Sequence, residues 1–273
     1  MALKPSRGDV VLVTGCSDGG IGAGLCRAFH AAGCYVFATA RRLESMAGLQ
    51  ALGIRTLSLD VTSAESIKEA VDAVVAEAGR IDVLVNNAGI GLVAPLAEVD
   101  MTKAQERGGV IANIGSVVAL VPTPWGGIYC ASKAAIHNLT ETLRLELAPF
   151  GIRVVLVAPG AVQSNIGANN LRRFDETFKL YGPWTGDIRA RALVSQGKES
   201  MPTDVFARGV VRQLLRRTPP RVFLLGGMVG MIRFALRLPL WLRDRMVSRK
   251  FGLNRKLPIP AAAPVQPGAA KAD

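Results

Sequence analysis

The sequence predicts a doubly wound α/β domain, in which helices cover both faces of a parallel sheet. Short apolar stretches alternate with segments of helical periodicity from Asp9 to Val157, and this alternation indicates repeated βαβ units. A glycine-rich turn follows the first apolar stretch directly. Apolar residues make up 49% of the chain, which suits a sheet that is buried on both faces. With 273 residues the chain is long enough for one large domain of this kind.

The elements can be placed from their periodicity. Strands are expected at residues 9–14, 34–39, 53–60, 81–85, 109–114 and 152–157. Helices are expected at residues 21–32, 63–78, 131–147 and 203–217. Ser63 is the expected N-cap of the second helix, because a serine hydroxyl can accept a hydrogen bond from the first helical turn. Residues 161–203 have a weaker pattern, with loops and one or two helical stretches.

Charge divides the chain. The net charge is +12, and residues 205–256 hold thirteen Lys and Arg against a single acid, Asp244, so that the excess charge lies there. We therefore expect one α/β domain at 1–220 and a basic, apolar C-terminal segment at 221–257. A Pro- and Ala-rich tail at 258–273 is expected to be disordered.

Other features narrow the class of protein. The four cysteines show neither metal-ligand spacing nor a disulfide framework, so we expect no metal site and a reducing compartment. No apolar run precedes Val10, and we expect no signal peptide.

The glycine-rich turn is the first candidate for a binding site. It comprises Thr14 to Gly22, between a strand and a helix. Glycine lets the backbone approach a pyrophosphate, and the N-terminus of a helix offers free N–H groups with a partial positive charge. Gly15, Ser17, Gly20, Ile21 and Gly22 are therefore the expected contacts of a dinucleotide.

Two further clusters follow the second and fourth strands. Arg41 and Arg42 stand where an acid would bind the ribose 2′-hydroxyl of NAD, so a basic pair favours the 2′-phosphate of NADP. Asn86 is followed by Asn87, Ala88 and Gly89, whose small size would let the cofactor lie over the strand ends.

Ser116, Tyr129 and Lys133 are the expected catalytic residues. Tyr129 and Lys133 are four residues apart, so they share one face of a helix. An ammonium beside a phenol favours the phenolate, and we expect Lys133 to lower the pKa of Tyr129. Tyr129 could then give a proton to a carbonyl oxygen that receives a hydride, while Ser116 hydrogen-bonds the same oxygen.

Together, these motifs over residues 8 to 160 resemble those of the classical short-chain dehydrogenase/reductase family. The resemblance implies a Rossmann fold, an NAD(P)(H) cofactor and Tyr129 as the catalytic acid/base. It also implies that Lys133 holds the nicotinamide ribose, that Asp60 and Val61 lie on the adenine side, and that Pro159, Gly160 and Val162 contact the cofactor.

A narrower resemblance is to the fungal NADPH-dependent 1-acyldihydroxyacetone-phosphate reductases. Five stretches carry it: 40–44, Ile128 to His137, Met201-Pro202, 231–234 and Trp241-Leu242. It implies reduction of a lipid-linked ketone at the endoplasmic reticulum or lipid droplets, on the cytoplasmic face. Arg172, Arg173, Arg189 and Arg191 are candidate contacts for the phosphate of such a substrate.

Two departures from the family pattern stand out. The glycine turn is one residue longer than usual, and we expect the loop to absorb it with Ile21 beneath the cofactor. Asn86 and Ser116 are thirty residues apart, where the family has roughly fifty, so we expect a shortened crossover between strands four and five. The helix that bears the family's catalytic asparagine would be missing, and Asn113 is no substitute. We therefore expect an apolar gap on one face of the sheet. The loss of this helix also leaves open whether the chain forms a homo-oligomer.

The stretch 222–242 is nearly all apolar. It is broken by Arg233, Arg237 and Pro239, and each arginine would cost roughly 2.5–3.5 kcal/mol at the middle of a bilayer. We therefore expect an interfacial segment on anionic lipid rather than a membrane-spanning helix. A hydrophobic lid or a core helix remains the alternative. Nucleic acid is not expected as a partner, because apolar residues outweigh polar ones.

The leading functional hypothesis is an NADPH-dependent reductase of a lipid-like ketone, with 1-acyldihydroxyacetone phosphate as the candidate substrate. A steroid- or retinoid-type hydroxyl dehydrogenase of the same family is the first alternative. A cofactor-binding protein whose catalysis is impaired by the shortened crossover is the second.

Overall fold

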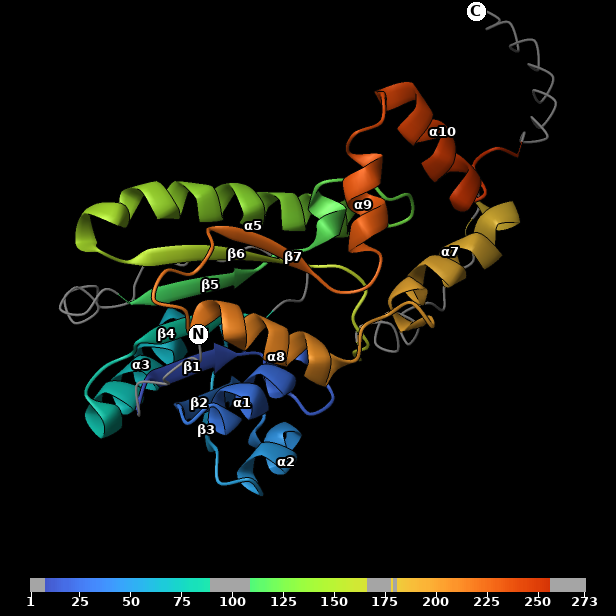
Figure 1. Ribbon diagram of the computed structural model, residues 1–273. Coiled ribbons are helices and arrows are strands. Elements are labelled where there is room, and N and C mark those ends of the chain that lie inside the picture. Colours follow the sequence, from blue (N-terminus) through green and yellow to red (C-terminus); the bar gives the residue numbers. More distant parts are fainter. Residues whose placement is uncertain (1–7, 89–108, 166–177, 179–180, 256–273) are drawn as a thin grey trace, which may run out of the picture.

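A computed structural model describes residues 8–88, 109–165, 178 and 181–255. Its described part forms one sheet of seven parallel strands in the order β3-β2-β1-β4-β5-β6-β7, with helices on both faces (Figure 1). The predicted doubly wound fold is confirmed. Gly89 and most of the predicted short crossover lie outside the described residues.

The strands are β1 (Val10–Thr14), β2 (Tyr35–Ala40), β3 (Arg55–Ser58), β4 (Val83–Asn86), β5 (Val110–Ile114), β6 (Arg153–Pro159) and β7 (Val222–Leu225). The α-helices are α1 (Ile21–Ala31), α2 (Ala47–Gln50), α3 (Ala64–Ala78), α5 (Gly127–Glu146), α7 (Thr185–Ala192), α8 (Thr203–Leu214), α9 (Val229–Ala235) and α10 (Leu240–Lys250). The third predicted long helix, α5, begins at Gly127 rather than at 131, and the fourth, α8, ends at Leu214 rather than at 217.

Side chains on β1 alternate between two cores, because successive residues of a strand face opposite sides of the sheet. Val11 and Val13 belong to a large core that includes residues of α1 and α8. Val10 and Leu12 belong to a smaller core with Val74 of α3. All four valine and leucine side chains are almost fully buried. This two-sided burial explains why the strand reads as a continuous apolar run.

Helices α1 and α8 pack closely against one another beneath the sheet (Figure 1). Gly24 of α1 makes this approach possible, because a β-carbon there would lie 2.7 Å from Cγ2 of Thr203. The fully buried rings of Phe29 and Phe206 fill the core on this side. The pair therefore fixes the position of α1, whose N-terminus lies at the glycine turn.

The opposite face carries α3 and α5, and its cover is thinner. Ser63 caps α3 as predicted, with its hydroxyl accepting from the N–H of Ser66 at 3.2 Å. In the middle of this face Leu84 of β4 and Ile111 of β5 are only half-buried, whereas Val85 and Ala112 on the other face are fully buried. The half-buried pair matches the apolar gap expected from a shortened crossover.

The sequence analysis missed the seventh strand. β7 comes from the stretch assigned to the interfacial segment, and it pairs with β6 at the edge of the sheet. Its four apolar residues are the cue, but the basic and apolar run that continues beyond them dominates the pattern. The sheet therefore extends past residue 220, and only the residues after β7 leave it.

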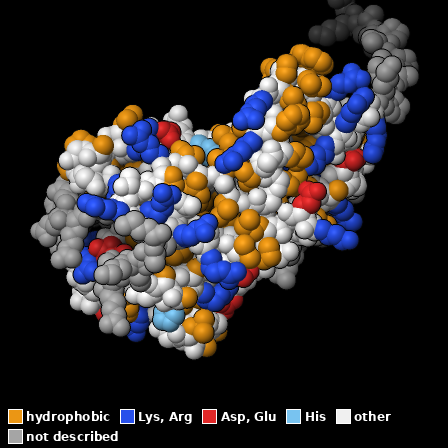
Figure 2. Space-filling model, in the orientation of Figure 1, with side chains coloured by type: hydrophobic (Ala, Val, Ile, Leu, Met, Phe, Trp, Pro, Cys, Tyr) orange, Lys and Arg blue, Asp and Glu red, His pale blue; other side chains and the backbone are white. Residues whose placement is uncertain are grey.

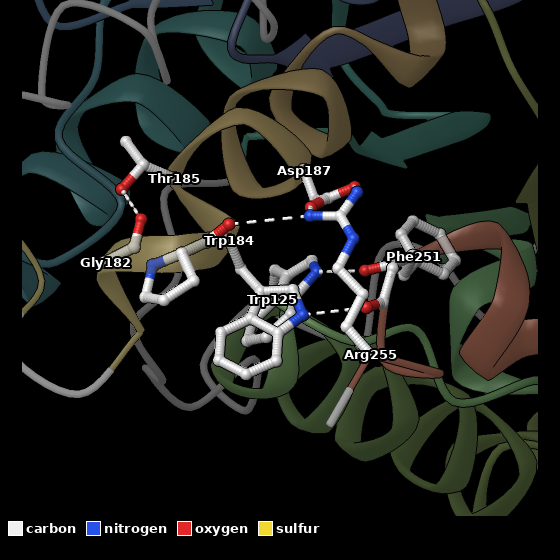
Figure 3. A network of polar contacts seen from close by, with 9 residues as sticks. Trp125, Gly182, Trp184, Thr185, Asp187, Phe251 and Arg255 are labelled. Carbon is white, nitrogen blue, oxygen red and sulfur yellow. Dashed lines mark hydrogen bonds and ion pairs between the residues drawn. The ribbon is translucent and has the colours of Figure 1, made fainter. Parts of the chain in front are cut away.

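The C-terminal end of α10 is tied back to the main body (Figure 3). The indole N–H of Trp184 donates to the carbonyl oxygen of Gly252 at 2.7 Å, and that of Trp125 donates to the carbonyl oxygen of Phe251 at 3.1 Å. Arg255 forms an ion pair with Asp187 of α7 at 2.9 Å. These contacts hold α10 beside α7 and beside the loop that enters α5.

Replacing Phe206 by Ala should destabilise the fold by about 3–5 kcal/mol, because a fully buried ring is lost and a cavity remains between α8 and the sheet. The free energy of unfolding from urea titration measures the effect. Val205→Ala is the matched control, since Val205 is the preceding residue and is 41% exposed. A loss below about 1 kcal/mol for Phe206→Ala would contradict the packing described here.

Candidate active site

The predicted site residues gather at the carboxyl edge of the sheet. The glycine turn follows β1, Arg41 and Arg42 follow β2, and Asp60 follows β3. Three further groups lie at the same edge: Asn87 and Ala88 after β4, Ser116 after β5, and Pro159 to Val162 at the end of β6. The strand order reverses between β1 and β4, with β2 and β3 on one side of this point and β5 to β7 on the other. Parallel sheets bind ligands in the crevice at such a switch point.

The glycine turn is packed against the end of β4. Gly15 has a φ of +73°, and a β-carbon there would lie 2.7 Å from Cα of Ala88. The side-chain amide of Asn87 donates to the carbonyl oxygens of Thr14 at 2.9 Å and of Gly15 at 3.0 Å. The hydroxyl of Thr14 in turn accepts from the backbone N–H groups of Asn87 and Ala88. These hydrogen bonds join the two halves of the predicted cofactor crevice.

The extra residue of the turn is absorbed by contacts with residues 43–50. The backbone N–H of Asp18 donates to the carbonyl oxygen of Ser45 at 2.7 Å, and its carboxylate accepts from the N–H of Gly48 at 2.9 Å. The hydroxyl of Ser17 lies 3.2 Å from that of Ser45. Ile21 is the first residue of α1 and packs against the large core.

The N-terminus of α1 fits a pyrophosphate. Its N-cap is Gly20, which offers no side-chain hydrogen bond, and its first turn contains no acidic residue. The first N–H groups of the helix therefore have no side-chain acceptor of their own and carry the positive end of the helix dipole. Such an end favours an anion directly above the glycine turn.

Arg41 and Arg42 are both exposed at the end of β2. Asp60 lies close to Arg41, and its carboxylate accepts from the N–H and the hydroxyl of Thr62 at 2.9 and 2.8 Å. These two hydrogen bonds, with a smaller contribution from Arg41, hold the pKa of Asp60 below its usual value. The edge of the sheet on this side is therefore a positively charged surface with one well-ordered carboxylate, next to Val61.

The last predicted cofactor contacts follow β6. The N–H of Gly160 donates to the carbonyl oxygen of Leu225 at 2.8 Å, and a β-carbon on Gly160 would lie 2.1 Å from the carbonyl oxygen of Gly227. Val162 turns its side chain into the large core. The segment that follows β6 is thus held by the end of β7 and the residues after it.

Ser116, Tyr129 and Lys133 come together as predicted. Ser116 follows β5 and is 7% exposed, and its side chain is close enough to Tyr129 of α5 to lower the pKa of the phenol. Nζ of Lys133 lies 5.8 Å from the centre of the Tyr129 ring and donates to the carbonyl oxygen of Ile114 at 3.0 Å. One helix face and one strand end therefore place a hydroxyl, a phenol and an ammonium beside the crevice.

The prediction that Lys133 lowers the pKa of Tyr129 is wrong for this structure. The pKa of Tyr129 is raised, chiefly because burial disfavours the phenolate, while the hydrogen bond with Ser116 and the charge of Arg191 lower it in part. Burial also lowers the pKa of Lys133. The sequence analysis considered the charge of the neighbour and omitted the loss of water around both groups.

The comparisons with known proteins agree with this geometry. The family model described as short chain dehydrogenase matches residues 9–107 and 100–173. The chain belongs to the short-chain dehydrogenase family. The two matched segments overlap at 100–107, within the connection between β4 and β5.

Several relatives have a similar length. The short-chain dehydrogenase ptmH of Penicillium ochrochloron is 37% identical over 269 residues, which cover 89% of this chain and 98% of the relative. The NADPH-dependent 1-acyldihydroxyacetone phosphate reductase of Schizosaccharomyces pombe is 39% identical over 189 residues, which cover 61% of this chain and 64% of the relative.

Solved structures give the same family. A short-chain dehydrogenase from Streptomyces avermitilis aligns with a TM-score of 0.68 and 29% identity, covering 92% of this chain and 99% of that one. An actinorhodin polyketide ketoreductase with NADPH aligns with a TM-score of 0.63 and 28% identity, covering 82% of this chain and 97% of that one.

One residue beside the short-chain dehydrogenase triad is not among the predicted site residues. His137 follows Lys133 by four residues on α5, and its Nε2 accepts from the backbone N–H of Ser116 at 3.2 Å. Continuing the four-residue spacing from Tyr129 through Lys133 would have found it. Asn113, by contrast, is fully buried and donates to the hydroxyl of Thr140, so it does not replace the family's catalytic asparagine.

Replacing Gly22 by Ala should weaken the binding of the dinucleotide by about tenfold or more, with the fold retained. The added methyl group would lie 2.4 Å from the carbonyl oxygen of Gly15 and 2.6 Å from Nδ2 of Asn87, so it displaces the turn. Quenching or transfer of protein fluorescence on titration with NADPH measures the affinity. Gly230→Ala is the control, because its β-carbon would meet nothing within 4 Å. Unchanged binding in Gly22→Ala would show that the turn does not hold the cofactor.

Proposed function

We propose that the protein is an NADPH-dependent reductase of a lipid-like ketone, with 1-acyldihydroxyacetone phosphate as the first substrate to test. The placement of Ser116 and Lys133 beside Tyr129, at the cofactor crevice, carries this proposal. The S. pombe relative is named for this substrate and this cofactor, which supports the choice of both.

The residues have separate roles in the proposed reaction. Bound NADPH would supply the hydride. The raised pKa keeps the phenol of Tyr129 protonated at neutral pH, so that it can give its proton to the carbonyl oxygen. Ser116 hydrogen-bonds that oxygen and orients it, and Lys133 supplies a positive charge beside the phenol and the ribose of the cofactor.

The charge at the end of β2 supports NADPH over NADH. Arg41 and Arg42 are exposed and available to a 2′-phosphate, and the carboxylate of Asp60, which lies near Arg41, is engaged by Thr62. A guanidinium is a strong partner for a phosphate, since it donates in a planar, bidentate geometry.

Arg191 supports a substrate that carries an anionic group. Its guanidinium lies beside Gly126, where an added β-carbon would come within 3.2 Å of Nη2, and Gly126 is the N-cap of the helix that bears Tyr129. Its Nε is buried and has no hydrogen-bond partner in the described part of the chain. Arg172 and Arg173 lie outside the described residues, so Arg191 is the leading candidate for the substrate phosphate.

We further propose that the enzyme works at a membrane surface, on the cytoplasmic face of the endoplasmic reticulum or of lipid droplets. Figure 2 shows apolar and basic side chains gathered over α9 and α10, where Phe234 is 57% exposed, Leu240 62% and Trp241 69%. Arg237, between the two helices, and Arg245 of α10 are also exposed. None of the helices in the described residues has the length and apolar composition needed to cross a bilayer. This combination favours contact with anionic lipid.

A second candidate function is cofactor binding with impaired catalysis. The observation that favours it is the short connection between β4 and β5, on which no counterpart of the family's catalytic asparagine was found in the sequence. The complete set of Ser116, Tyr129 and Lys133 favours catalysis.

Purified protein in mild detergent should oxidise NADPH in the presence of a long-chain acyl-dihydroxyacetone phosphate, and faster than it oxidises NADH. Tyr129→Phe should lower the rate by a factor of about 10² or more, because the proton donor is lost. Absorbance at the nicotinamide band measures both. The control is cofactor binding, which Tyr129→Phe should retain. Ketones without a phosphate, and steroid or retinoid alcohols with the oxidised cofactor, complete the panel. Binding of NADPH without turnover on any of these would establish the second candidate function instead.

Replacing Phe234 and Trp241 together by Glu should reduce binding to vesicles that contain anionic lipid by about tenfold or more, since both exposed side chains would exchange burial in the interface for a charge that the lipid repels. Co-sedimentation with vesicles measures the bound fraction. Leu52→Glu is the control, because Leu52 is also exposed and follows α2. Equal binding of the double variant and the wild type would rule out this surface.

A further inference from the structure

We propose that His137 is the positioning residue of Ser116: its neutral imidazole holds the Ser116 peptide against α5, and protonation of the ring releases it. The inference rests on the proposed reductase reaction, because it concerns the geometry of the same site. It adds a fourth residue, and a dependence on acid pH, to the three that the family pattern supplies.

The contact joins the two elements that carry the catalytic groups. Ser116 lies two residues after the end of β5, and its backbone N–H donates to Nε2 of His137 at 3.2 Å. The residue before it, Gly115, donates its N–H to the carbonyl oxygen of Val157 at 2.8 Å. β6 therefore holds one side of this short segment and the imidazole of α5 holds the other.

Gly115 provides the space for the ring. A β-carbon on Gly115 would lie 2.3 Å from Nε2 and 2.6 Å from Cδ2 of His137, which no side chain can tolerate. The imidazole therefore packs directly on the backbone that precedes Ser116. This close approach distinguishes a specific contact from a histidine that merely lies on a helix.

The same helix face carries Tyr129, Lys133, His137 and Glu141 at intervals of four residues. The side chain of Ser116 lies beside Tyr129, and its backbone N–H donates to His137. Helix α5 thus faces both the side chain and the backbone of Ser116. The peptide bond fixes where Cα lies, and the hydroxyl can then reach both the phenol and the substrate oxygen.

The ring must be neutral for this contact. Nε2 accepts a hydrogen bond, so the proton of the neutral imidazole is on Nδ1. Burial is the main cause that lowers the pKa of His137 below 6.5, and the charge of Lys133 lowers it further, while that of Glu141 raises it. Three residues outside α5 lie close to the His137 ring, and none of them is charged: Gly115 and Ser116 after β5, and Leu156 of β6.

The pH dependence follows from the direction of this shift. A lowered pKa means that the folded site favours the neutral ring, so the contact is present at neutral pH and is lost as the pH falls through the lowered pKa. The imidazolium has a proton on both nitrogens and cannot accept from Ser116. Acid should therefore reduce the rate through Ser116 while Tyr129 stays protonated.

Two substitutions separate the acceptor from the titration. His137→Gln can place its amide oxygen near the position of Nε2, so it keeps an acceptor that does not titrate. His137→Leu removes the acceptor and keeps an apolar side chain. We expect kcat of the wild type to fall as the pH decreases through the lowered pKa of the ring, where the imidazole becomes protonated. We expect His137→Gln to lack this acid limb, and His137→Leu to lose about tenfold in kcat at every pH.

The cofactor affinity should stay within about twofold of the wild type in both variants, because the contact lies after β5, whereas the glycine turn follows β1. An acid limb in His137→Gln that equals that of the wild type would overturn the proposal. So would a kcat in His137→Leu equal to that of the wild type.

A measurement that does not need turnover tests the same contact. The chain has only two histidines, so ¹⁵N-histidine labelling gives two sets of ring signals, and His30→Gln assigns them. We expect the Nε2 signal of His137 to be that of an unprotonated acceptor at neutral pH, and its titration midpoint to lie below 6.5. A proton on Nε2 at neutral pH would overturn the proposal. If the protein reduces no ketone while this signal behaves as expected, the proposed function fails and the positioning contact stands.

Discussion

The hydrogen bonds between the end of β1 and the end of β4 are the interaction on which the site depends. These strands are neighbours in the sheet, although β2 and β3 come between them in sequence, so the crevice opens at their carboxyl ends. Asn87 donates two hydrogen bonds to Thr14 across it, and a β-carbon at Gly15 or Gly22 would lie too close to Ala88 or Asn87 after β4. The glycine turn is therefore a rigid floor for a dinucleotide, held from both halves of the sheet.

Helix α5 performs the corresponding task for the catalytic groups. It packs on β5 and β6, and its residues at four-residue intervals face the end of β5. Lys133 donates to the carbonyl oxygen of Ile114, and His137 accepts from the N–H of Ser116. Two side chains of the helix therefore form hydrogen bonds with the backbone at the strand end. A single rigid element thus places proton donor, ammonium and the support of the serine, which suits a reaction that needs fixed geometry.

The short connection between β4 and β5 affects cover more than topology. The two strands still pair in parallel register, from Val83 opposite Val110 to Asn86 opposite Asn113. Leu84 and Ile111 remain half-buried on the face of α3 and α5, where the neighbouring strands are otherwise well covered. The catalytic residues lie on α5 and after β5, beyond this connection, and the structure keeps them together. The thinner cover of this face therefore does not separate the three candidate catalytic residues.

The sequence by itself determined the fold class, the edge of the sheet at which the site lies, and the residues Ser116, Tyr129 and Lys133. These follow from local patterns: apolar runs, a glycine turn after a strand and a four-residue spacing on a helix. Only the tertiary structure decided β7, because a short edge strand within a long apolar and basic stretch has no pattern of its own. It alone also showed that burial, rather than the charge of Lys133, governs the pKa of Tyr129, and that His137 reaches the backbone of Ser116. Desolvation and contacts between distant elements depend on packing in three dimensions, which spacing along the chain does not contain.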